Sequence, residues 1–176
     1  IWEKGAMFRF FQVNRDIFLR TLCLVAVTLF FTSAGASQGE IILAVNTLLM
    51  QLFTLFSYVM DGFAYAGEAL SGRYIGARNR EAFTDTVRHL FGWGAVIAVL
   101  FTLVYALGGN AFLGLLTDDK EVIAVADTYF YWALAVPAVG IAAFIWDGIF
   151  IGATATRGML LSMAAAAVSF FILYYG

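Results

Sequence analysis

The sequence predicts an all-α fold, a polytopic bundle of transmembrane helices. Hydrophobic residues make up 62% of the 176 residues and charged residues 12%, with a mean hydropathy of +0.88. A soluble domain averages about half apolar and a quarter charged residues. The apolar residues gather into five long runs, and the aromatic share of 17% is typical of a protein with interfacial anchors.

The five runs predict five membrane spans within one domain, residues 1–176. Residues 1–16 form a basic, aromatic lead-in, for which a surface helix is expected. About 20 helical residues cross the roughly 30 Å hydrocarbon core. The chain lacks an initiator methionine and stops inside an apolar run, so we expect a piece of a longer protein whose fifth span is truncated. The expected spans are residues 17–37, 41–72, 87–107, 122–152 and 159–175.

The basic residues predict the orientation of these spans. With the N-terminus inside, nine of the ten Lys and Arg residues fall on or near the cytoplasmic side, and only Lys120 lies outside. This asymmetry follows the positive-inside rule. We therefore expect a multi-pass protein of the cell (inner or plasma) membrane, with the N-terminus of this chain in the cytoplasm.

The second span carries a stripe of polar residues. They recur at steps of 4, 3, 4, 3, 4 and 3, which keeps them on one face of a helix. Lipid satisfies no hydrogen bonds, so this face needs a protein neighbour or a water-filled cavity. A transport pathway is the first interpretation, with Gln51, Thr54, Tyr58 and Tyr65 lining its cavity. The stripe consists of Thr47, Gln51, Thr54, Tyr58, Asp61, Tyr65 and Glu68.

Three carboxylates are candidates for cation coupling or substrate binding: Asp61, Glu68 and Asp147. An ionisable group at membrane depth is costly and usually marks an ion or substrate path. The alternative for Asp61 and Glu68 is a structural role, paired with Arg20 or Arg73. Snorkelling to water explains Asp127 near the outer end of the fourth span.

Other features of the spans predict structural roles. Asp16 and Arg20 are spaced for an i,i+4 ion pair that anchors the first span. Pro137 with Gly140 predicts a hinge, a break or kink in the fourth helix, and the alternative is a harmless bend. Asn46 and three small-xxx-small spacings predict close helix packing. These spacings are Gly35…Gly39, Gly72…Gly76 and Gly148…Gly152.

Several function classes find no support in the sequence. The chain has no nucleotide-binding P-loop and no nucleophile elbow of the G-x-S-x-G type. Cys23 and His89 are each the only residue of their type, so no cofactor or Cys/His metal site is expected. A net charge of -2, dispersed along the chain, does not indicate a nucleic-acid partner. The sequence therefore does not predict an enzyme.

Three segments resemble the DinF-like branch of the multidrug and toxic compound extrusion (MATE) transporters. Residues 61–80, DGFAYAGEALSGRYIGARNR, look like the family's eighth helix and the loop after it. Residues 14–23, NRDIFLRTLC, resemble the start of the seventh helix, and residues 146–159, WDGIFIGATATRGM, the end of the tenth. The chain would then supply helices seven to eleven of twelve.

The resemblance implies an antiporter with two six-helix lobes, which exports organic and often cationic compounds by alternating access against H⁺ or Na⁺. It places Asp147 at an acidic position that binds the cation in one branch, and Asp61 in the eighth-helix motif. Its implied partners are membrane lipid, small organic substrates and a missing N-terminal lobe of the same parent chain. The seventh helix lacks a buried acid, which favours H⁺ and leaves Na⁺ at Asp147 as the alternative.

Two further functions stay open at this point. A flippase for lipid-linked precursors belongs to the same superfamily, but such cavities are richly cationic and the intramembrane charges here are mainly acidic. A passive channel subunit is the other alternative, and it would conduct without a driving gradient.

Overall fold

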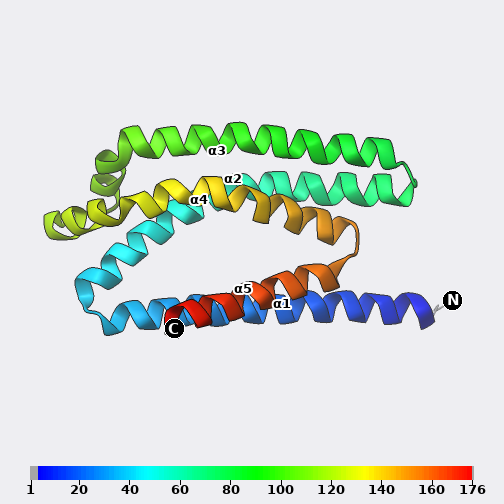
Figure 1. Cartoon of the computed structure of the whole chain (residues 1–176), viewed down its shortest axis with the longest axis horizontal. Coiled ribbons are helices and arrows are strands. Elements are labelled where there is room, and N and C mark those ends of the chain that lie inside the picture. The colour runs from blue at the N-terminus through cyan, green and yellow to red at the C-terminus, as the bar shows by residue number, and fades with distance from the viewer. Residues whose placement is uncertain (1–3, 176) are drawn as a thin grey trace.

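The computed structural model describes residues 4–175, which form five α-helices without a strand among them (Figure 1). Each helix contains a stretch long and apolar enough to cross a membrane. The predicted class, an all-α polytopic bundle, is therefore confirmed. The helices are α1 (Lys4–Ser37), α2 (Glu40–Gly76), α3 (Arg80–Leu116), α4 (Lys120–Gly152) and α5 (Thr156–Tyr175).

The helices extend further than the expected spans, and the connections between them are shorter. The basic lead-in is not a separate surface helix, because α1 runs without interruption from Lys4. Side-chain caps start α3 and α4 close to the preceding helix. Asn79 Oδ1 accepts from the amide of Ala82 at 3.0 Å, and Asp119 Oδ1 accepts from the amide of Glu121 at 2.9 Å. The limits of each span in a bilayer stay a prediction.

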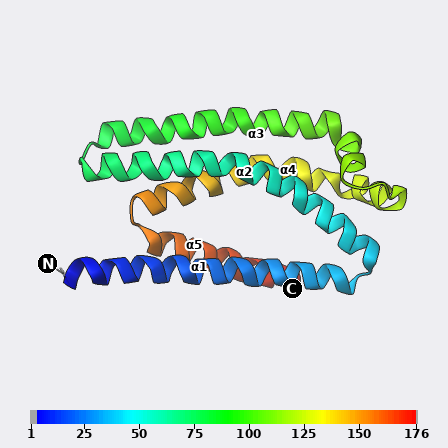
Figure 2. The same cartoon turned by 180° about the vertical axis from the view of Figure 1, so that it is seen from behind.

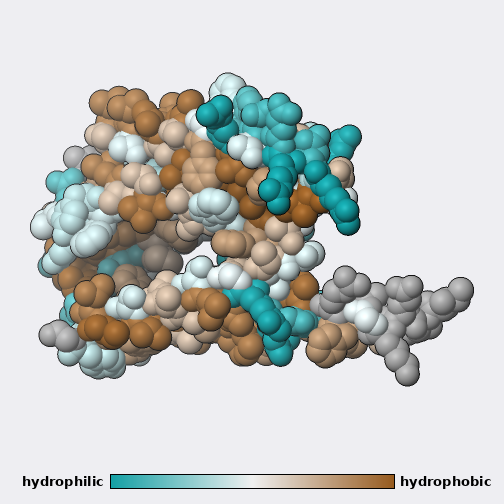
Figure 3. All heavy atoms as spheres, turned by 45° about the vertical axis from the view of Figure 1, so that its right-hand side comes forward, coloured by the Kyte–Doolittle hydropathy of each residue, from teal (hydrophilic) through white to brown (hydrophobic). Residues whose placement is uncertain are grey.

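The helices form two packing units. Helices α2, α3 and α4 make a bundle in which α2 packs most extensively on α4, while α1 pairs with α5 (Figures 1 and 2). Within residues 4–175 the backbones of the two units come close only where α1 continues into α2 and α4 into α5, and those of α1 and α4 do not approach each other. Figure 3 shows an opening between the two units.

The core lies inside the three-helix bundle. One cluster of buried side chains surrounds Tyr105, whose hydroxyl donates to the carbonyl oxygen of Leu52 at 2.7 Å. A second cluster contains Phe56, Met60 and Ile145, with Phe56 and Met60 fully buried. Phe56 and Met60 lie on the face of α2 opposite the polar stripe, so burial of this apolar face leaves the stripe tyrosines exposed.

Helices α2 and α4 cross where α4 has two glycines. A Cβ atom on Gly148 would overlap the carbonyl oxygen of Ala64, and one on Gly152 would overlap that of Glu68. The close approach predicted for this small-xxx-small pair is confirmed. On α1, a Cβ on Gly35 would lie 2.7 Å from the side-chain nitrogen Nδ2 of Asn46 on α2, a movable side-chain atom in place of a backbone carbonyl.

The expected break at Pro137 is absent. Helix α4 continues through this proline as one helix, and Pro137 is among the fully buried residues. Gly140 leaves space for Phe56, whose ring atom lies 3.0 Å from the place a Cβ would occupy. A hinge at Pro137 and Gly140 stays a prediction. It depends on the backbone hydrogen bond that a proline cannot donate, and not on an interruption of the helix.

Gly148→Val is expected to separate α2 from α4. The added side chain meets a backbone carbonyl that has no rotamer with which to move away, so we expect a loss of roughly 2 kcal/mol or more in unfolding free energy. Thermal unfolding of the detergent-solubilised protein measures this effect. Gly92→Val is the matched control, because nothing lies within 4 Å of a Cβ there. Equal loss in both variants would contradict a specific crossing at Gly148.

The ends of α2 and α4 carry the same strained turn. Arg78 and Thr154 have φ angles of +54° and +53°, each two residues beyond the last helical glycine. The amides around both turns bond back to helix carbonyls in the same pattern, as with Thr154 to Ile151 at 2.9 Å. Such left-handed C-terminal positions favour glycine, and a β-branched residue is the least suited.

Thr154→Gly is therefore expected to stabilise the protein by about 1 kcal/mol, because glycine adopts this φ without a Cβ clash. The measurement is the midpoint of thermal unfolding. Thr154→Ala keeps a Cβ in the same conformation and should give no such gain. A fall in the midpoint of the Gly variant would mean that the Thr154 side chain stabilises the turn by more than the strain costs.

Candidate functional site: a carboxylate groove between α1, α4 and α5

The polar stripe of α2 faces away from the bundle core. Tyr58 and Tyr65 are 72% and 70% exposed, while Asp61 and Glu68 are half-buried. Thr54 bonds to its own helix, donating to the carbonyl oxygen of Met50 at 2.8 Å. The face is thus open at its tyrosines, and neither α3 nor α4 covers them.

The α2–α4 crossing places three carboxylates in one region. Asp147 immediately precedes Gly148, whose backbone lies against Ala64, three residues beyond Asp61. Glu68 is the residue whose carbonyl meets Gly152. Asp61 and Glu68 each repel the charge of the Asp147 carboxylate across the crossing. The structure therefore brings together the three acidic residues singled out from the sequence.

Arg20 supplies the opposing charge. Its Nη2 lies 2.8 Å from Oδ1 of Asp147, and both side chains are 25% exposed. The expected i,i+4 pair between Asp16 and Arg20 is wrong, because the two side chains point to different helices. The alternative in which Arg20 pairs with Asp61 or Glu68 is not found, because Arg20 pairs with Asp147 instead. Sequence spacing carries no signal for this contact between α1 and α4.

The ion pair lines a groove of about 510 Å³ between α1, α4 and α5. Its walls are largely apolar, with Trp146 and Phe150 from α4 and Met159 and Met163 from α5. The Trp146 ring lies 5.8 Å from that of Phe150, between centroids. Aromatic faces and polarisable thioethers suit an amphipathic or cationic organic compound. Of these groove residues, the sequence pointed to Asp147 and missed the others as a group.

Asp16 holds the other polar contact of α1. Its carboxylate is fully buried and accepts from the hydroxyl of Thr156 at 3.2 Å, while Arg15 pairs with it at 2.9 Å. Nearby, Gln12, with its amide oxygen toward Arg157, accepts from that guanidinium at 2.7 Å. These contacts tie the first turn of α5 to α1, which confirms a structural anchor for Asp16 with different partners.

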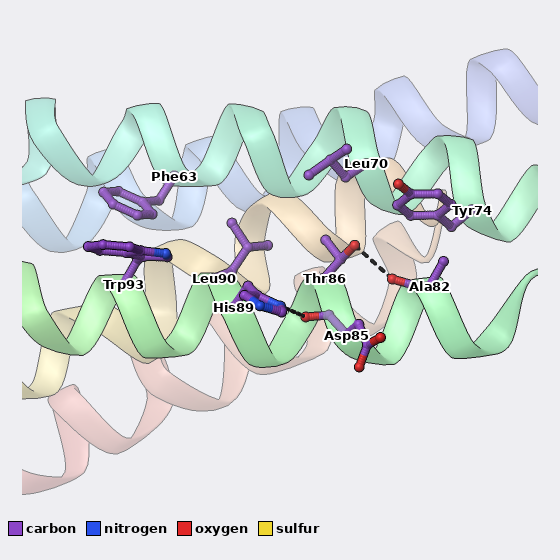
Figure 4. Close-up of a pocket in the computed structure, with 9 residues that line it drawn as sticks. All are labelled: Phe63, Leu70, Tyr74, Ala82, Asp85, Thr86, His89, Leu90 and Trp93. Atoms are coloured by element: carbon purple, nitrogen blue, oxygen red, sulfur yellow. Dashed lines mark hydrogen bonds between the residues drawn. The ribbon is translucent and has the colours of Figure 1, made fainter.

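A second groove, of about 440 Å³, lies between α2 and α3 (Figure 4). Phe63 and Trp93 face each other across it, and the Asp85 carboxylate points away from them. His89 is engaged through Nδ1 with the Asp85 carbonyl oxygen at 2.7 Å. This groove lacks the inward-facing charges of the first, so we place the candidate site at Asp147.

Within residues 4–175 there is no group of three or more His, Cys, Asp or Glu side chains arranged to hold a metal ion. The Asp147 carboxylate is instead matched by an arginine. Any coupling ion at this position would therefore meet a site that already contains one positive charge.

Comparison with known proteins identifies the family. The MatE family profile matches residues 17–175. The chain belongs to the MatE family. It is 41% identical over 167 residues to the DNA damage-inducible protein F of Escherichia coli K12, which covers 95% of this chain and 36% of that protein. It is 26% identical over 133 residues to the chloroplastic Protein DETOXIFICATION 45 of Arabidopsis thaliana, covering 76% of this chain and 24% of the relative.

The family match and the similarity to the DNA damage-inducible protein F together confirm the resemblance to the DinF-like branch. The chain spans about a third or less of the length of these relatives. No solved structure matches. The activity of the whole protein is accordingly a matter for proposal.

Asp16→Ala is expected to loosen α5 from α1. The substitution leaves the buried Thr156 hydroxyl without its acceptor, which costs about 1–3 kcal/mol in unfolding free energy. Thermal unfolding in detergent measures the loss. Asp127→Ala is the control, since Asp127 is exposed on α4. A midpoint for Asp16→Ala equal to that of the control would contradict the anchoring role.

Proposed function

We propose that this chain is part of a secondary active exporter of organic compounds. One observation carries the proposal: Asp147 lines a groove with aromatic and methionine walls, and two further carboxylates, Asp61 and Glu68, lie within range of its charge at the α2–α4 crossing. An intramembrane carboxylate cluster is typical of an ion or substrate path. Membership in the MatE family supports transport rather than catalysis, and relatives named for detoxification support efflux.

The proposed mechanism is alternating access. Asp147 and Asp61 take up a cation from outside, with Glu68 adding negative charge. The change in charge then weakens the hold on the exported compound and favours its release. Gln51, Thr54, Tyr58 and Tyr65 line the path on α2, where exposed tyrosine rings offer faces to organic cations. Pro137 and Gly140 give α4 the compliance that the transition needs.

The coupling ion in this proposal is H⁺, with Na⁺ at Asp147 as the alternative. A proton neutralises a carboxylate without needing further ligands. Na⁺ would need several oxygen ligands, and the basic side chain nearest to Asp147 is Arg20. The Arg20 guanidinium opposes the uptake of either cation at Asp147, because an opposite charge nearby favours the ionised carboxylate. The preference for H⁺ therefore rests on its needing no further ligands.

The proposed setting is a multi-pass protein of the plasma or inner membrane, with the start of α1 on the cytoplasmic side. The hydrophilic side chains that gather where α2 turns into α3 (Figure 3) support this orientation, because several of them are arginines. A second lobe of the parent protein would face the α2 stripe and complete the path.

Asp61→Asn and Asp147→Asn in the intact protein are expected to reduce export driven by a pH gradient at least ~10-fold, because neither side chain then exchanges a proton. The assay follows efflux of a fluorescent organic cation from inverted vesicles, with and without the gradient. Asp127→Asn is the matched control and should transport normally.

Undiminished proton-driven export in both variants would overturn the site assignment. Flux that is equal with and without the gradient would indicate a passive channel instead of an exporter.

A further inference from the structure

The unassigned feature of the groove is its arginine. Arg20 comes from α1 and is the one basic residue among those that line the groove in the described chain. It reaches Asp147 on α4, although the backbones of these two helices do not approach each other. An arginine within a predicted membrane span is energetically costly unless it is paired. We therefore expect Arg20 to do more than form part of the groove wall.

We propose that Arg20 is a resident cation that competes with transported cations for Asp147. The inference rests on the proposed role of Asp147 as the cation-binding carboxylate. In this structure the Arg20 guanidinium forms an ion pair with that carboxylate. A compound or ion binds Asp147 only when the guanidinium leaves it. Arg20 is thus a specificity-determining and positioning residue of the site.

The charges around Asp147 support competition. Asp61 and Glu68 on α2 repel the Asp147 carboxylate, and Arg20 on α1 attracts it. The α5 residues that line the groove are not ionisable. Three carboxylates against one guanidinium leave an excess of negative charge, so the region attracts a second cation, while the 2.8 Å contact keeps that cation from the best position on Asp147.

The ion pair also connects the two packing units. It is a polar contact between α1 and α4 across the groove, in a structure where these helices share no backbone contact. A cation that displaces Arg20 therefore breaks a connection between the α1–α5 pair and the three-helix bundle. Binding at Asp147 and freedom of α1 are then linked, because each favours the state in which the ion pair is open.

The test measures binding of tetraphenylphosphonium to the intact protein in lipid nanodiscs, by equilibrium dialysis and by quenching of tryptophan fluorescence. This probe carries a permanent charge, so its own protonation cannot change. Triphenylphosphine oxide, similar in shape and uncharged, is the matched control probe. The variants are Arg20→Gln, Arg20→Lys, Asp147→Asn and the double variant with Gln and Asn.

Arg20→Gln is expected to raise the affinity for tetraphenylphosphonium about 10-fold, since a charged hydrogen-bonded competitor has been removed. Arg20→Lys should give an intermediate gain in affinity, because the lysine ammonium keeps the charge but cannot form the two-pronged contact of a guanidinium with a carboxylate. The double variant should bind no better than Asp147→Asn, and the neutral probe should not distinguish Arg20→Gln from the wild type. A purely structural Arg20 would instead give weaker binding of both probes on removal.

Unchanged or weaker tetraphenylphosphonium binding in Arg20→Gln overturns the inference. If the Arg20→Gln protein is not monodisperse, Arg20→Met is used in its place, because methionine keeps an apolar side chain of similar length without the charge. Failure of the proposed function has a separate measurement: the wild-type protein would show no gradient-driven efflux in the vesicle assay. A gain in binding without any export would uphold the role of Arg20 while rejecting the exporter.

Discussion

The close crossing of α2 and α4 is the constraint on which the rest of the structure depends. Gly148 and Gly152 let the two backbones meet at Ala64 and Glu68. Without water or a strong hydrophobic force between helices in lipid, such close packing is a main source of association. The crossing fixes the distance between the acidic residues on the two helices. Packing and charge placement are therefore one feature of this fold.

A second consequence is the division into two packing units. The three-helix bundle buries its apolar faces within itself, whereas α1 is held by α5 and by polar contacts. Asp16 anchors α1 to the start of α5, and Arg20 joins it to Asp147. Both contacts are charged, and both lie on one helix a single turn apart. If the charge of Asp147 changes, its ion pair with Arg20 weakens, and with it one connection between the α1–α5 pair and the three-helix bundle.

The sequence predicted the fold class because a bilayer restricts both the length and the secondary structure of a spanning segment. Apolar runs of about 20 residues must be helices, since lipid leaves no other way to satisfy the backbone. It also predicted the α2 stripe and the glycine pair on α4. It placed the helix ends less well: side-chain caps at Asn79 and Asp119 shorten connections that composition alone makes look long. Pro137 shows the same limit, because burial in a bundle keeps α4 continuous through it.

The sequence by itself determined which charged residues fall within the long apolar helices and on which helical face they lie, since helical periodicity is a local property. Only the tertiary structure decided their partners. Spacing favoured Arg20 for Asp16 on the same helix, but side-chain direction along α1 sends Asp16 to Thr156 and Arg20 to Asp147. These contacts span 140 and 127 positions in the chain, and they depend on how helices pack, which no short-range pattern encodes.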